Sequence, residues 1–61
     1  MFDPWIVRQL HDELDAIKAA GEDVPPDAYD VACDLGHLVE EGVSPRIVAE
    51  HAIELTRRGF V

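Results

Sequence analysis

A cysteine and a histidine, both able to bind metal ions, stand at helical spacing in the middle of the chain. Cys33 lies four residues after Tyr29 and four before His37, so the three would line one edge of a helix. A thiolate and an imidazole at this spacing can hold a metal ion, but zinc needs at least three protein ligands. The others would have to come from His11, His51 or carboxylates on different helices. We therefore expect no metal and no cofactor, and we interpret this edge as one that docks onto another surface.

Cys33 is also a candidate nucleophile, because a thiol becomes reactive when it ionises to the thiolate. Its neighbours Asp30 and Asp34 carry negative charge, which raises a thiol pKa and suppresses the thiolate. No spacing in the chain suggests a paired acid and base or an activated nucleophile. We expect no catalytic residues and a protein that is not an enzyme.

Acidic residues dominate the charge of the chain. Thirteen Asp and Glu against five Lys and Arg give a formal net charge of −8 at pH 7. Direct nucleic-acid binding is not expected, because it needs clustered Lys and Arg to displace counterions from phosphates. A basic protein partner would instead be attracted. The predicted acidic surface consists of Asp27, Asp30, Asp34 and Glu41; it is either a solvated face or a binding surface, and mimicry of DNA is a third reading.

Aromatic residues near the two ends of the chain are candidates for a protein interface. Trp5 lies off the apolar stripe of its helix, and tryptophan is enriched among binding hot spots. Tyr29 and Phe60 are further interface candidates. The alternative is that Trp5, Phe2 and Phe60 together plug one end of a helix bundle.

The elements that must position these residues are three helices, in a single domain that spans residues 1–61. Apolar residues recur at three- and four-residue steps, and no segment alternates as a strand does. The chain is therefore expected to be all-α, a small three-helix bundle. The predicted helices span residues 4–20, 26–41 and 45–58. Gly36 lies inside the second, where it either allows another backbone to approach closely or is simply tolerated.

The third predicted helix has an unusually wide apolar arc. It comprises Ile47, Val48, Ala49, Ala52, Ile53 and Leu55. Two neighbouring helices with narrow stripes cannot cover so wide a face, and Ile53 lies at its edge. We expect a second copy of the chain to cover Ile53, which makes the protein a homodimer. The alternative is a monomer in which Phe60 and Val61, or the Trp5 end, fold across this edge.

The turn before the third predicted helix has residues that are preferred for ending one helix and starting the next. Gly42 can end a helix in the left-handed conformation, Ser44 can cap the next helix, and Pro45 suits its first position. With Val43 and Val48, this segment resembles the helix-turn-helix of bacterial repressors over about fifteen positions. The resemblance implies a second helix that enters the major groove of DNA. Ser44, Arg46 and Glu50 would be the residues at the DNA.

No apolar run is long enough to span a membrane, and the N-terminus lacks a signal-peptide pattern. Cys33 has no second cysteine with which to form an internal disulfide. We expect a cytoplasmic protein without membrane association. Its expected function is that of a small acidic, non-enzymatic interaction module that self-associates and binds a partner protein, itself basic or nucleic-acid-binding. A helix-turn-helix DNA-binding transcriptional regulator is the alternative, and an inhibitor that mimics DNA is the third.

Overall fold

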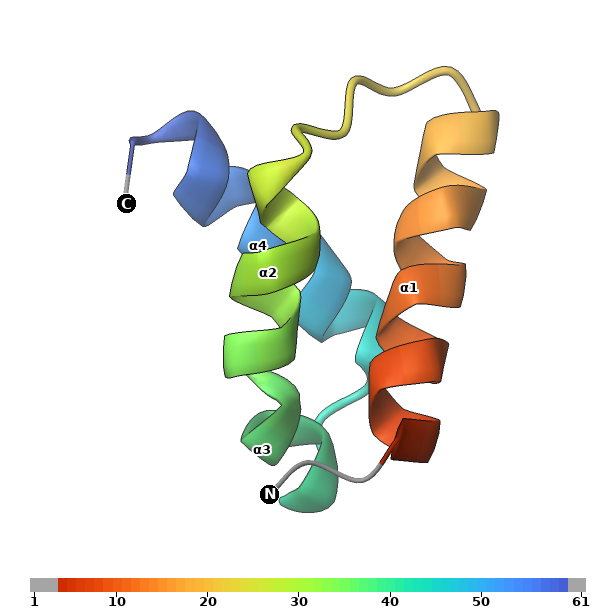
Figure 1. The fold of residues 1–61 in the computed structure, drawn as a ribbon, viewed down its shortest axis with the longest axis vertical. Coiled ribbons are helices and arrows are strands. Elements are labelled where there is room, and N and C mark those ends of the chain that lie inside the picture. Colours follow the sequence, from red (N-terminus) through yellow and green to blue (C-terminus); the bar gives the residue numbers. More distant parts are fainter. Residues whose placement is uncertain (1–3, 60–61) are drawn as a thin grey trace.

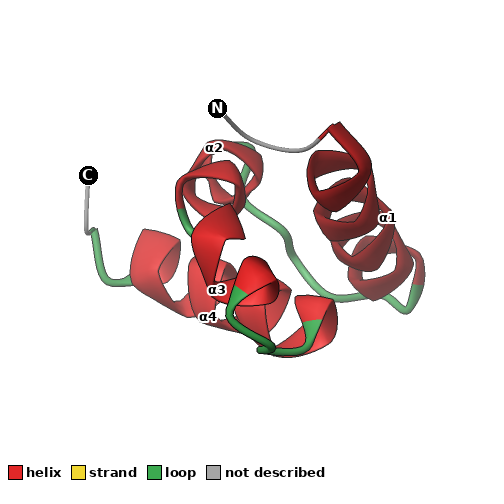
Figure 2. Cartoon of the chain, turned by 90° about the horizontal axis from the view of Figure 1, so that it is seen from below, coloured by secondary structure: helices red, strands yellow, loops and turns green. Residues whose placement is uncertain are grey.

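The computed structural model describes residues 4–59 as four packed helices and contains no strand in that range. They are α1 (Pro4–Ala19), α2 (Asp27–Asp34), α3 (Gly36–Glu40) and α4 (Pro45–Arg57). In Figure 1, α1 and α2 stand side by side and run in opposite directions, and α4 starts beside α1 and crosses behind α2. The view from below places α4 in a second layer beneath α1 and α2 (Figure 2). The all-α prediction is confirmed.

The predicted helix over residues 26–41 is wrong in one respect, because it is divided at Leu35. That residue has φ −92° and ψ 6°, outside the helical range. The Leu38 amide then donates to the Leu35 carbonyl at 2.9 Å, a tighter turn than an α-helix makes. Gly36 directly follows the break, and glycine is among the residues that propagate a helix least well. Around this break Gly36 is buried, and Leu35 and Leu38 pack against the core.

Glycines end α1 and α3 in the same manner. Gly21 and Gly42 have φ of +98° and +102°, a backbone region that L side chains rarely adopt. After α3, the Val43 amide donates to the Leu38 carbonyl at 2.9 Å and the Gly42 amide to the Val39 carbonyl at 3.0 Å. These bonds satisfy carbonyls that a helix end leaves without partners. At the start of α4, the Ser44 hydroxyl accepts a hydrogen bond from the Arg46 amide at 3.2 Å, as expected for a cap.

The core lies where the two layers meet. Its buried members are Ile6, Leu10, Leu14, Ile17, Val24, Ala28, Val31, Ala32, Val48, Ala49, Ala52 and Ile53. Four of them are alanines with no exposed surface, two on α2 and two on α4. Small side chains at facing positions let helices approach closely, so α4 can lie tightly against α2.

The connection between α1 and α2 is tied to the fold at two points. Val24 is buried, and the guanidinium of Arg57 donates to the carbonyl oxygen of Asp23 at 3.0 Å. These contacts hold the linker against the end of α4. No helix in the described part of the chain is both long and apolar enough to cross a membrane.

Candidate interaction surfaces

Among residues 4–59, two large apolar side chains remain exposed after the core has formed. Trp5 on α1 is 63% exposed and Ile47 on α4 is 58% exposed. Ile47 was placed in the apolar arc of the third helix, but it projects away from the core. An exposed apolar side chain on so small a domain is a candidate anchor for another chain. The predicted interface residue Phe60, like Phe2, lies outside the described residues.

Ile53 requires a correction, because the chain itself covers it. Its side chain is 6% exposed and belongs to the core cluster. A step of six residues separates Ile47 from Ile53, which places them about 120° apart around the helix. The two layers of the fold cover the Ile53 edge of the arc and leave the Ile47 edge open. The argument that a second copy must cover Ile53 is therefore wrong.

The edge predicted to dock onto another surface contacts α1 of the same chain. The Tyr29 hydroxyl donates to Oδ1 of Asp15 at 2.6 Å, and the Tyr29 and His11 rings meet edge to face with centroids 5.1 Å apart. His11 Nε2 lies 3.7 Å from Sγ of Cys33. Tyr29 thus contacts α1 of its own chain, whereas the sequence predicted it as a residue of an interface with another protein. Sequence reasoning assigned no role in this contact to Asp15 or His11, because spacing alone does not reveal which helices are neighbours.

This α1–α2 contact offers little acid–base or metal chemistry. Burial, followed by the charges of Asp30 and Asp34, raises the pKa of the Cys33 thiol, as the sequence predicted for those two aspartates. His37 turns away, with Nδ1 3.2 Å from the carbonyl oxygen of Asp34. Within residues 4–59, no three His, Cys, Asp or Glu side chains are grouped so as to hold a metal ion.

We predict that Tyr29 titrates above its ordinary pKa of about 10. The hydrogen bond to Asp15 raises the pKa first, followed by burial and the Asp15 charge. The neutral phenol is favoured in the folded state, so this stabilisation is complete below the unfolded pKa and is lost as pH rises through the folded value. Tyr29 is the only tyrosine, so tyrosinate absorbance reports its titration directly.

Asp15→Ala is the matched variant for this titration, because it removes the acceptor and leaves the phenol. The Tyr29 pKa should then fall towards its ordinary value. In Tyr29→Phe, the free energy of unfolding should depend less steeply on pH above about 10 than in the wild type. An unchanged tyrosine pKa in Asp15→Ala would show that the hydrogen bond is not formed.

The residues of the predicted acidic surface are all exposed. Asp27, Asp30 and Asp34 lie along α2, whereas Glu41 follows α3 beyond the break at Leu35. The segment from residue 19 to residue 45 contains no Lys or Arg. Its acidic residues are Glu22, Asp23, Asp27, Asp30, Asp34, Glu40 and Glu41. Most of the negative charge therefore lies on the linker, α2 and α3.

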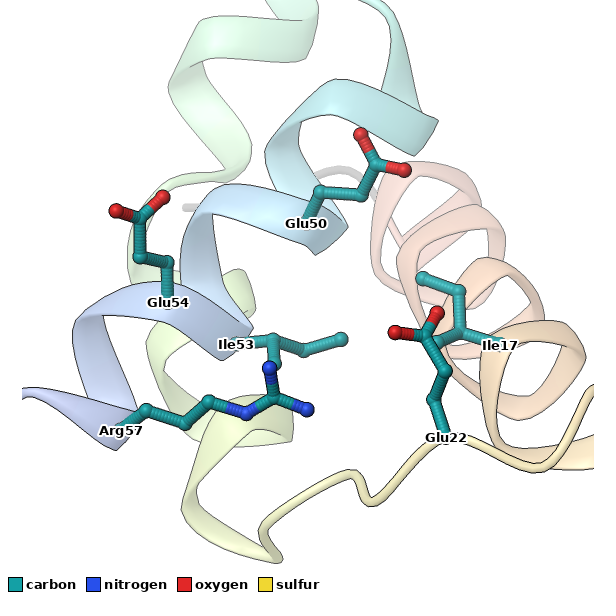
Figure 3. Close-up of a pocket in the computed structure, with 6 residues that line it drawn as sticks. All are labelled: Ile17, Glu22, Glu50, Ile53, Glu54 and Arg57. Atoms are coloured by element: carbon teal, nitrogen blue, oxygen red, sulfur yellow. The ribbon is translucent and has the colours of Figure 1, made fainter.

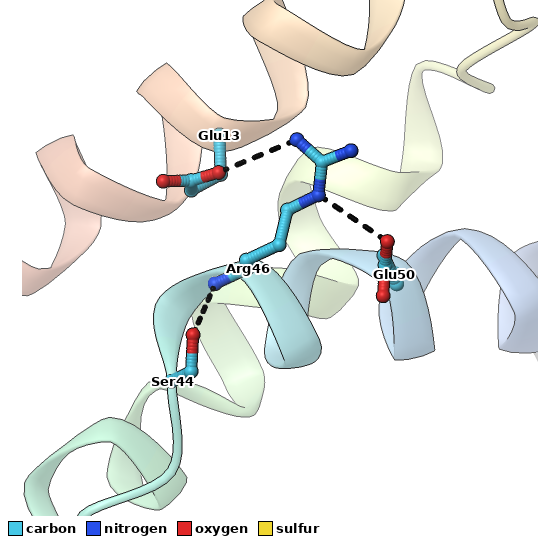
Figure 4. Close-up of polar contacts among 4 residues, drawn as sticks. All are labelled: Glu13, Ser44, Arg46 and Glu50. Carbon is cyan, nitrogen blue, oxygen red and sulfur yellow. Dashed lines mark hydrogen bonds and ion pairs between the residues drawn. The ribbon is translucent and has the colours of Figure 1, made fainter.

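Arg46, the basic residue of the DNA-binding alternative, is turned towards carboxylates of its own chain (Figure 4). Its Nε lies 3.2 Å from Oε2 of Glu50, and its Nη1 lies 3.7 Å from Oε1 of Glu13 on α1. Ser44 is occupied as the cap of α4. The residues assigned to DNA contact are thus near one another, but their polar groups contact each other and α1.

A shallow cleft of about 300 Å³ opens between the end of α1, the following linker and α4. It is lined by Ile17, Glu22, Glu50, Ile53, Glu54 and Arg57. In Figure 3 the guanidinium of Arg57 and the carboxylate of Glu22 point towards the two isoleucines, whereas the carboxylates of Glu50 and Glu54 point away from them. We call it the Ile17–Ile53 cleft. Sequence reasoning missed it, because residues 17, 22 and 53 come together only through the packing of α4 on α1.

Comparisons with protein-family models, with curated proteins and with solved structures found no match to this chain.

Proposed function

We propose that the protein is a non-enzymatic interaction module that binds another protein chain through Trp5 and Ile47. The observation that carries this proposal is the exposure of these two large apolar side chains beside a core that is buried without them. Removing such a side chain from water on binding contributes roughly 1.5–3 kcal/mol. The net charge of −8 favours a basic partner and speeds its approach. A cytoplasmic location belongs to this proposal.

Self-association remains part of the proposal, now through Ile47 rather than Ile53. Two copies carry a formal charge of −16, twice the −8 of one chain. Salt should strengthen a dimer by screening this repulsion. Sedimentation equilibrium at several concentrations and two salt levels measures the monomer–dimer equilibrium. Ile47→Ser should shift this equilibrium to monomer. A species of 6.8 kDa at every concentration would refute self-association and leave binding to a different protein open.

The alternative proposal is a helix-turn-helix regulator that binds DNA through the start of α4. Its support is the glycine stop at Gly42 and the serine cap at Ser44, two of the residues on which the resemblance to that motif rests. The pairing of Arg46 with Glu13 and Glu50 counts against it, since the motif needs free basic groups near phosphates. A DNA-mimicking inhibitor ranks third, and its support is the exposure of the acidic residues on α2 and after α3.

We predict that substitution of the exposed anchors removes partner binding without unfolding the protein. Immobilised wild type, Trp5→Ser, Ile47→Ser and the control Ala16→Ser would be compared in extracts of the native cell by quantitative mass spectrometry. Ala16 is exposed on α1, so Ala16→Ser introduces the same residue at an exposed helical position without removing an anchor. Proteins that the wild type and Ala16→Ser retain should fall at least about tenfold with Ile47→Ser or Trp5→Ser. Equal retention by all four proteins would refute the proposed function.

A further inference from the structure

Trp5 and Ile47 lie on the two sides of one contact between helices. Arg46 on α4 marks this contact, because its Nη1 lies 3.7 Å from Oε1 of Glu13 on α1 (Figure 4). Trp5 precedes Glu13 by eight residues, which turns it about 80° further from the buried stripe of α1. Ile47 directly follows Arg46 and is turned about 100° further from the buried residues of α4. Both anchors therefore project on the same outer side of the contact between α1 and α4.

We call this outer side the α1–α4 face. Its residues are Trp5, Gln9 and Glu13 on α1 and Arg46, Ile47 and Glu50 on α4. The charged members are already paired with one another, because Nε of Arg46 also lies 3.2 Å from Oε2 of Glu50. A chain that covers this face therefore needs apolar groups for the two anchors, but it needs neither a strongly positive nor a strongly negative surface.

The negative charge of the chain is concentrated outside this face. The segment from residue 19 to residue 45, which includes the linker, α2 and α3, carries seven Asp and Glu and no Lys or Arg. The rest of the chain carries six Asp and Glu and five Lys and Arg, a formal charge of −1 out of the total of −8. Salt screens charges that are more than about 8–10 Å apart, so the charges nearest to a contact repel most. Two copies therefore meet with the least repulsion through α1 and α4.

We propose that a second copy of the chain covers the α1–α4 face, with Trp5 of each copy packed against Ile47 of the partner subunit. A twofold axis midway between the two anchors exchanges them, so one dimer buries two such contacts. The indole offers a large flat apolar surface, and both side chains leave water on contact. This inference rests on the proposed function, in which these two residues bind another chain, and it names that chain and the contact.

The test uses Trp5 as its own probe, because it is the only tryptophan of the chain. Its fluorescence emission should move to shorter wavelength as the wild-type protein is concentrated, and sedimentation equilibrium gives the dissociation constant of the dimer. Trp5→Ser and Ile47→Ser should each weaken the dimer at least about tenfold. The control His37→Ser places serine at an exposed position of α3 and should leave the constant within about twofold. Circular dichroism should show the same helicity in all four proteins, because the three positions are exposed.

Mixing the two anchor variants distinguishes the proposed contact from other pairings of the same face. Each variant alone loses both contacts of its dimer. In a mixed dimer, the intact Trp5 of one variant meets the intact Ile47 of the other, so one contact is restored. Because Trp5→Ser contains no tryptophan, adding it to Ile47→Ser should move the emission of the latter to shorter wavelength, at concentrations where Ile47→Ser alone is monomeric.

Two results would overturn the proposed contact. If each anchor packed on its own counterpart in the second copy, the mixed dimer would be weaker than either variant alone, and no shift in emission would follow mixing. A wild type that stays monomeric at every concentration would overturn the dimer itself. The proposed function is decided separately by the cell extract, where it stands if the anchors retain proteins other than copies of this chain and fails if all variants retain the same proteins.

Discussion

Leu14→Ala is expected to lower the free energy of unfolding by about 2–5 kcal/mol, because it leaves a cavity in the centre of the core. Leu14 lies in the buried stripe of α1 and has no exposed surface. A chain of this length has a total stability of roughly 3–9 kcal/mol, at about 0.05–0.15 kcal/mol per residue. The variant should therefore lose most of its stability and populate the unfolded state substantially.

The matched control for Leu14→Ala is Ile47→Ala, which shortens a large aliphatic side chain at an exposed position. Its stability should change by no more than about 0.5 kcal/mol. Urea unfolding followed by circular dichroism gives both values. If the two variants were equally stable, the division into a buried α1 stripe and an exposed Ile47 would be wrong.

Ala52→Leu is expected to destabilise the protein by about 1–3 kcal/mol or more, because it overfills the contact between α4 and the layer above it. Ala52 has no exposed surface, and the alanines that α2 and α4 bring to the core are equally buried. A leucine there must push α4 away from α2 or adopt a strained rotamer.

Ala16→Leu provides the comparison, because Ala16 is exposed in the last turn of α1. The same substitution there adds no volume to the core, and leucine is nearly as good a helix former as alanine. Its thermal midpoint should stay close to that of the wild type, whereas each kcal/mol lost in Ala52→Leu lowers the midpoint by about 4–8 °C. A midpoint for Ala52→Leu at or above that of Ala16→Leu would show that the helices are not closely packed at this position.

The break at Leu35 shows a limit of local reasoning. The sequence indicated a cost for Gly36 inside a helix, but a cost of about 1 kcal/mol does not decide between tolerance and a break. The decision depends on whether Leu35, Leu38 and Val39 gain more by packing in a turn than in a continuous helix. All three are partly buried against the core, and the turn at Leu35 permits this.

The contact between α1 and α2 also could not be predicted from the sequence. Tyr29 and Cys33 were correctly placed on one edge of a helix, and the aspartate neighbours of Cys33 were correctly expected to raise its pKa. The edge was expected to dock, but the surface it meets is Asp15 and His11 of the same chain. Helical spacing shows which residues share one face of a helix, but it does not show which face of another helix that face contacts.

The sequence by itself determined the helical class and the helix ends at Gly42 and Ser44, because these depend on interactions within a few residues of chain. Only the tertiary structure decided that Ile53 is buried and Ile47 exposed. Both lie on one wide apolar arc, and the angle at which α4 crosses the other layer selects the covered edge. That angle follows from how side chains of separate helices pack together, including the small alanines of α2 and α4. It is a property of pairs of helices and is therefore not encoded in the periodicity of either one.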